Sequence, residues 1–219
     1  MEKIENLFGV YFNIPKQISN KIAQAQKDCN IYYSRNYIFT PHVTFYASKF
    51  TASAFEEFEQ AIKECKLKPF KIKVGKVKSD QSLRKDNAFL YVDILKNRSL
   101  MDAHKVILKI ANKLRGNLIR AKDTVRIKNN VYTAEETKYI KKYGFMRVLK
   151  FFRPHITLGE LSTKEAQEKS LKKNLKARFS DLEGKEFEVK SIMISFQLYS
   201  NIKKTFLDRG SIIKEIKLK

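Results

Sequence analysis

The chain has 219 residues, of which 43% are hydrophobic, enough for a real core, so a disordered basic tail is excluded. Lys and Arg number 45 against 23 Asp and Glu, and the formal charge of +22 favours an anionic partner, most simply nucleic acid, unless it reflects a general lysine bias. Cys29 and Cys65 lack metal-type spacing, which indicates reduced thiols, and no apolar run is long enough to span a membrane.

The first half alternates strand and helix patterns. The periodicity predicts strands at 8–14, 41–46 and 70–77 and helices at 16–28 and 53–65. In the third strand the apolar positions shift register after Gly75, which indicates a bulge.

The second half repeats this order. We expect strands at 90–94, 155–159, 187–189 and 192–198, helices at 99–115 and from about 162 to 177, and a closing strand through Ile212, Ile213 and Ile216. A β-α-β-α-β unit therefore occurs twice in one domain spanning 1–219, with pseudo-repeats over about 7–80 and 87–200.

A basic and aromatic segment at about 116–150 has no counterpart in the first half. It contains Tyr143 and Arg147 among many Lys, Arg, Tyr and Phe residues. We expect a long functional loop, because cations mixed with aromatic rings suit phosphates and stacked bases. The alternative is a surface insertion that covers a small aromatic cluster.

Two short stretches of the chain nearly repeat each other. They are Pro41-His42-Val43-Thr44-Phe45 and Pro154-His155-Ile156-Thr157-Leu158, and they hold two of the three histidines. Each falls on a predicted strand, where residues i and i+2 point to the same face. Each copy therefore presents an imidazole and a hydroxyl side by side.

If the two units pack around a pseudo-twofold axis, both pairs can converge on one small anion. One neutral histidine would take a proton from a nucleophile and the other would protonate a leaving oxygen, in either assignment. The hydroxyls of Thr44 and Thr157 would donate to non-bridging phosphate oxygens. This set suits phosphodiester chemistry without a metal.

Three other interpretations carry less weight. A single strand histidine is usually structural, but the duplication argues against that for His42 and His155. Two histidines with Glu160 as the only nearby carboxylate make a poor metal-ligand set, so we expect no metal and no cofactor. His104 shares an apolar helix stripe with Leu100 and Ile107, which indicates a histidine at the edge of the core.

The paired motifs resemble those of the two-histidine (2H) phosphoesterase superfamily. Phe152-Arg153-Pro154-His155-Ile156-Thr157-Leu158 is especially similar to the 2′-5′ RNA ligase/cyclic phosphodiesterase (LigT-like) branch. The first copy departs from it, since Tyr46-Ala47-Ser48-Lys49 replaces an apolar-Gly ending. The resemblance implies an α+β, bilobal fold in which two antiparallel sheets flank a central groove with outer helices.

The resemblance also implies site residues and an activity. His42 and His155 are the implied acid/base pair, Thr44 and Thr157 the phosphate ligands, and Arg153 a phosphate or groove contact. Tyr46, Tyr143 and Arg147 are further candidates for substrate binding. We expect hydrolysis of RNA or oligonucleotide phosphodiesters, chiefly opening of a 2′,3′-cyclic phosphate to a 2′-phosphate.

Two other functions stay open at this point. One is cleavage of a 2′-5′-linked or cyclic oligonucleotide signal, and the other is noncatalytic RNA binding; reversible ligation is chemically compatible with the same site. In each case we expect a monomer in the cytoplasm with an RNA or oligonucleotide partner and no membrane association.

Overall fold

The computed structural model describes residues 4–31, 41–81, 87–162, 165–200 and 205–219. The strands are β1 (Ile4–Asn13), β2 (His42–Lys49), β3 (Phe70–Gln81), β4 (Asn87–Leu95), β5 (His155–Ser162), β6 (Glu186–Val189), β7 (Ser191–Ser200) and β8 (Thr205–Lys217). The helices are α1 (Lys16–Ile31), α2 (Ala52–Glu64), α3 (Arg98–Leu114), α4 (Ala121–Lys128), α5 (Ala134–Tyr143), η1 (Leu149–Phe151) and α6 (Glu165–Phe179).

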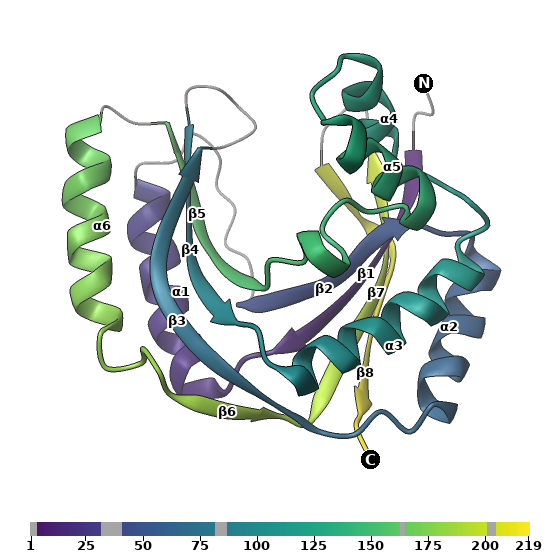
Figure 1. Ribbon diagram of the computed structural model, residues 1–219, viewed down its shortest axis with the longest axis horizontal. Coiled ribbons are helices and arrows are strands. Elements are labelled where there is room, and N and C mark those ends of the chain that lie inside the picture. The colour runs from purple at the N-terminus through teal and green to yellow at the C-terminus, as the bar shows by residue number, and fades with distance from the viewer. Residues whose placement is uncertain (1–3, 32–40, 82–86, 163–164, 201–204) are drawn as a thin grey trace.

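The strands form one antiparallel sheet, which corrects the expectation of two separate sheets. Its order is β6-β3-β4-β5-β2-β1-β7-β8, and the two histidine strands β5 and β2 pair at its centre. The sheet curls, with β3–β5 on one side and β1, β2, β7 and β8 on the other (Figure 1). The two halves of the expected fold are therefore joined directly at the histidine strands.

The strands of the two predicted units are interleaved in the sheet. β3 closes the first unit but pairs with β4 of the second, whereas β7 of the second unit pairs with β1 of the first. The sheet order is consequently symmetric about the β5/β2 junction. Sequence periodicity finds each strand, but it carries no information on which strands pair across the chain.

Helices cover the outer surface of each half of the sheet. α1 packs against β5 and α6 against β3, while α2 contacts α3 and β7 (Figure 1). Gly159 in β5 allows the approach of α1, because a Cβ there would lie 2.7 Å from the Cβ of Cys29. The predicted bulge in β3 is confirmed, since the pairing with β4 shifts register between Val74 and Val77.

The core lies behind the histidine strands. Val43 and Ile156 are fully buried, and Phe45 stacks parallel to Phe152 with ring centroids 6.1 Å apart. Burying each such side chain contributes roughly 1.5–3 kcal/mol. His104 is also fully buried, deeper than the core-edge position that its helix stripe predicts, and its ring stacks on Phe152 with centroids 3.9 Å apart. The histidine strands are thus backed by rigid packing.

The segment at 116–150 is not an extended loop but the two helices α4 and α5 followed by η1. Thr133 and Glu136 form a capping box at the start of α5, and Gly144 ends the helix with a φ of 71°. Apolar periodicity misses both helices because they are short and polar. In Figure 1 they stand over the end of β2.

Candidate functional site

The pairing of β2 with β5 brings both motifs together. The antiparallel register places Val43 opposite Ile156, and continuing it by one residue in each direction puts His42 opposite Thr157 and Thr44 opposite His155. Residues directly opposite share a face of the sheet. All four motif side chains therefore lie on one face, where each is half-buried.

The hydrogen bonds of His155 define its tautomer. Nδ1 lies 2.7 Å from the carbonyl oxygen of Arg153, and Nε2 lies 3.2 Å from Nη1 of Arg147. A guanidinium can only donate, so Nε2 accepts and Nδ1 carries the proton. The imidazole is thereby oriented with its basic nitrogen toward the guanidinium of Arg147.

The surroundings of His155 favour its neutral form. Burial and, to a smaller extent, the positive charge of Arg147 lower its pKa to about 4, while the bond to the Arg153 carbonyl acts in the opposite direction. Burial and the charge of Arg153 also lower the pKa of Arg147. At neutral pH, His155 therefore holds a free-base imidazole suited to accepting a proton.

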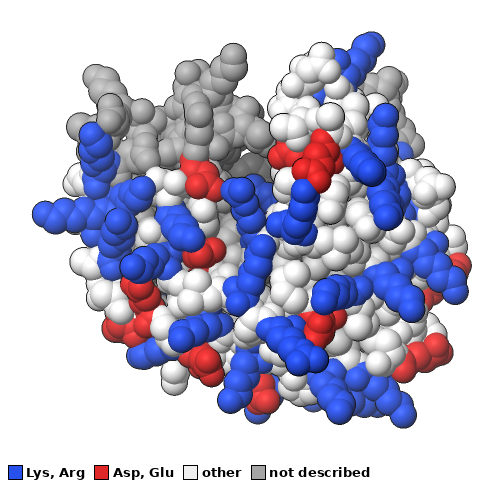
Figure 2. Space-filling model, in the orientation of Figure 1, with Lys and Arg blue, Asp and Glu red and all other residues white. Residues whose placement is uncertain are grey.

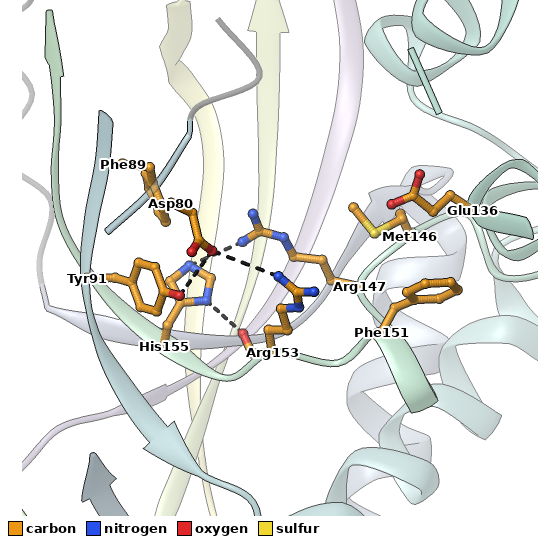
Figure 3. A pocket seen from close by; sticks show the side chains of 9 residues that line it. All are labelled: Asp80, Phe89, Tyr91, Glu136, Met146, Arg147, Phe151, Arg153 and His155. Atoms are coloured by element: carbon orange, nitrogen blue, oxygen red, sulfur yellow. Dashed lines mark hydrogen bonds and ion pairs between the residues drawn. The ribbon is translucent and has the colours of Figure 1, made fainter. Parts of the chain in front are cut away.

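A cavity of about 150 Å³ adjoins His155 and has aromatic and charged walls (Figure 3). The rings of Phe89 and Tyr91 lie 5.5 and 5.4 Å from the imidazole. Asp80 accepts a 3.0 Å hydrogen bond from the Tyr91 hydroxyl and lies 3.8 Å from Arg153. Burial, then Asp80, raises the pKa of Tyr91 to about 12, so its hydroxyl stays a donor.

Tyr11 and Tyr91 are equivalent residues of the duplication that the sequence interpretation missed. Tyr11 pairs with Thr44, and Tyr91 pairs with Thr157, each just after a register shift in its strand. The ring of Tyr11 lies 4.7 Å from that of His42. The sequence does contain a pattern that could have identified this pair of tyrosines. Val10-Tyr11-Phe12-Asn13-Ile14 and Leu90-Tyr91-Val92-Asp93-Ile94 match residue by residue in type.

Of the residues predicted to bind substrate, the two arginines line cavities near His155 and the two tyrosines do not. Arg147 and Arg153 line the cavity beside His155, as well as a second cavity that also includes Thr44. Tyr46 is fully buried, and its hydroxyl donates a 2.7 Å hydrogen bond to the carbonyl of Tyr143. Neither tyrosine lines these two cavities, and the side chain of Tyr46 anchors the end of α5, so substrate binding by Tyr46 or Tyr143 stays a prediction.

Buried polar side chains hold α5 against the sheet. Arg115 is 1% exposed and donates to the carbonyls of Leu118, Lys141 and Lys142 at 2.9, 3.0 and 2.6 Å. Ser48 adds a 3.1 Å hydrogen bond to the carbonyl of Gly144. These bonds satisfy helix-terminal carbonyls that would otherwise be unpaired. The sequence interpretation missed Arg115 because an arginine after an apolar helix stripe is typical of solvated helix ends.

Charge is spread widely over the surface. Figure 2 shows Lys and Arg scattered over the described part of the visible face, with Asp and Glu interspersed. The described residues contain no group of three or more His, Cys, Asp or Glu side chains placed to hold a metal ion. Among the described helices, none has the length and apolar character needed to cross a membrane. On this face, charge alone therefore does not single out a binding site.

Known proteins match the chain in sequence and in fold. The family described as "Protein of unknown function (DUF1045)" matches residues 92–201, half of the chain. No curated protein sequence matches the chain significantly. In solved structures, TT0787 of Thermus thermophilus aligns with a TM-score of 0.53 and 10% identity over 97% of each chain.

LigT of E. coli gives a similar result. Its complex with 3′-AMP aligns with a TM-score of 0.52 and 12% identity, covering 98% of this chain and 96% of LigT. The apo form of LigT aligns with a TM-score of 0.50 over 99% of this chain. At this identity the likeness concerns the fold. The chain thus belongs to the family described as Protein of unknown function (DUF1045), and it has the fold of the LigT-like 2H phosphoesterases.

Proposed function

We propose that this protein is a phosphodiesterase that opens 2′,3′-cyclic phosphate ends of RNA or oligonucleotides to 2′-phosphates without a metal. The observation that carries the proposal is the direct pairing of β2 with β5, which sets two imidazoles and two hydroxyls on one face. The acid, the base and the phosphate ligands are then all side chains. The LigT-like fold supports phosphoester chemistry, and LigT itself is seen with 3′-AMP.

The surroundings of His155 support one assignment of roles. Nε2 of His155, neutral and unprotonated, takes a proton from the water that attacks phosphorus. His42, as the imidazolium, donates a proton to the 3′ oxygen as the P–O3′ bond breaks, which leaves the phosphate on the 2′ oxygen. Thr44, Thr157 and Arg147 donate to the non-bridging oxygens, where charge accumulates.

Product analysis on defined substrates tests the proposal. Oligonucleotides with a 2′,3′-cyclic end, a 2′-5′ linkage or only 3′-5′ linkages are incubated with the protein in EDTA. We expect conversion of the cyclic end to a 2′-phosphate by the wild type and not by His42→Ala or His155→Ala. Equal turnover by wild type and variants contradicts the proposal, and a preference for the 2′-5′ linkage redirects it to oligonucleotide signals.

A further inference from the structure

The second cavity extends from the motif residues to the inserted helices. It has a volume of about 280 Å³ and is lined at one end by Thr44 and His155. Its other walls include Arg120, Lys122 and Arg126, from the start and body of α4. The insertion and the duplicated motif therefore open onto one continuous space.

The lining of this cavity is strongly cationic. Five of its lining residues are Lys or Arg, and none of its described lining residues is Asp or Glu. Among these cations, Arg120 pairs with Asp123, and Arg153 lies 3.8 Å from Asp80. Neither carboxylate belongs to the described lining of the space. The cavity beside His155 differs, because Asp80 and Glu136 line it directly.

Arg120 is held in place rather than solvated. Its side chain is 11% exposed, its Nε donates a 2.6 Å hydrogen bond to Asp123, and its guanidinium lies 5.0 Å from the ring centroid of Phe145. Asp123 is fully buried and also accepts a 2.8 Å hydrogen bond from Tyr132. Arg126 donates to that Tyr132 hydroxyl at 3.3 Å. One buried carboxylate thus organises two guanidinium groups at the cavity wall.

Removing charges from water is costly, so the ordered and partly buried guanidinium groups of Arg120 and Arg126 are poorly explained by stability alone. A preorganised cluster gains most from a ligand that carries concentrated negative charge and several acceptor oxygens. Burial raises the pKa of Tyr11, whose ring contacts His42, and the positive charge of Arg120 acts in the opposite direction, so the field of Arg120 reaches the first motif. This location suits a second phosphate of the same substrate.

The geometry points to a second phosphate-binding subsite, formed by Arg120, Lys122 and Arg126, that selects substrates with a phosphate group beyond the one that reacts. The inference rests on the proposed function for the identity of the reacting phosphate. The second phosphate can be a 5′-monoester on the same nucleoside or an internal diester of an oligonucleotide. Both present the same oxygens to the subsite, and the substrate panel distinguishes them.

Turnover is compared on three substrates: adenosine 2′,3′-cyclic phosphate, its 5′-phosphorylated form and a dinucleotide with a cyclic end. We expect a second phosphate to raise kcat/KM by roughly ten- to hundredfold, chiefly through KM. The substrate whose kcat/KM is higher shows whether the second phosphate is a 5′-monoester or an internal diester. In the double variant Lys122→Gln/Arg126→Gln, substrates with and without the second phosphate should have nearly equal kcat/KM values. Lys138→Gln, which changes an exposed residue on α5, should keep the wild-type difference between them.

Calorimetry separates this inference from the proposed function. Adenosine 2′-monophosphate and adenosine 2′,5′-bisphosphate are titrated into the wild type and the double variant, with no turnover required. Tighter binding of the bisphosphate that the double variant abolishes supports the subsite even if no substrate is cleaved. Equal affinities together with equal kcat/KM values overturn it, even if the protein is a phosphodiesterase.

Discussion

His42 and His155 occupy equivalent positions on two paired strands, but their surroundings differ. His155 accepts a hydrogen bond from Arg147 and lies near Phe89 and Tyr91, next to the inserted segment. Beside His42, the ring of Tyr11 lies across Gly9, where an added Cβ would be 2.0 Å from the Tyr11 hydroxyl. Phe89 is the residue that matches Gly9 in the second copy. The duplicated frame positions two similar groups, and the unequal neighbours favour different roles for them.

The residues that follow each motif show the same divergence. Gly159 admits α1 to the back of β5, whereas its counterpart Tyr46 anchors the end of α5. One copy is therefore specialised for close helix packing and the other for holding the insertion. By holding the end of α5, Tyr46 supports the inserted segment, whose residues Arg120, Lys122 and Arg126 line the second cavity.

The largest expected effect follows from removing either histidine. His42→Ala and His155→Ala should each lower kcat by roughly 10²–10⁴-fold, because each deletes a proton-transfer group. The double variant should be little worse than either single variant, since the two act on one transition state. Steady-state rates in EDTA check this, with circular dichroism as the control for folding. If either single variant kept its activity within tenfold of the wild type, His42 and His155 would not act as the proposed acid/base pair.

The second effect concerns stability near the entry to the second motif. His104 accepts a 3.1 Å hydrogen bond from the Leu149 amide, and burial lowers its pKa to about 4. Because its pKa is lower in the folded state than in the unfolded chain, its contribution is intact above pH 6.5 and is lost as the pH falls to about 4. The wild-type unfolding free energy should drop by about 3 kcal/mol from this residue over that window.

Urea denaturation between pH 4 and 7 measures that drop. His104→Leu removes the titrating group, so its unfolding free energy should fall less steeply over the same window, even though the variant is less stable at pH 7 from loss of the Leu149 acceptor. Parallel curves for wild type and variant would show that His104 does not bind its proton differently in the two states.

The third effect tests the electrostatic difference between the histidines. Arg147→Gln removes a positive charge beside His155, so the pKa of His155 should rise and the acid limb of the kcat/KM profile should move to higher pH. Loss of a charged phosphate donor should also lower kcat/KM at pH 7 by roughly ten- to hundredfold. Arg98→Gln, at an exposed arginine on α3, is the matched control. An unmoved acid limb would contradict the assignment of His155 as the base.

The smallest effect compares the two equivalent tyrosines. Tyr91→Phe removes the hydrogen bond to Asp80, which lies near Arg153, and should lower kcat/KM by about two- to tenfold. Tyr11→Phe keeps the ring against His42 and should have the smaller effect. Parallel kinetics on one substrate checks the order. If Tyr11→Phe lowered kcat/KM more than Tyr91→Phe, the tyrosine hydroxyl of the first copy would contribute more to turnover, which contradicts this prediction.

Local patterns in the sequence predicted most elements and the four motif residues, because strand alternation and a repeated motif depend only on neighbouring residues. They could not predict that β2 pairs with β5, or that the strands of the two units are interleaved, because pairing is set by contacts between distant segments. The burial of Tyr46 could not be predicted for a related reason. Its strand breaks the alternation there, with Phe45 and Tyr46 both buried.

The convergence of both motifs on one phosphate can be measured directly by NMR, since the chain has only three histidines. The imidazole signals are followed while adenosine 2′-monophosphate is added. We predict that His42 and His155 shift together with one dissociation constant and that buried His104 stays unchanged. A shift of only one motif histidine, or two different dissociation constants, would contradict a shared phosphate site.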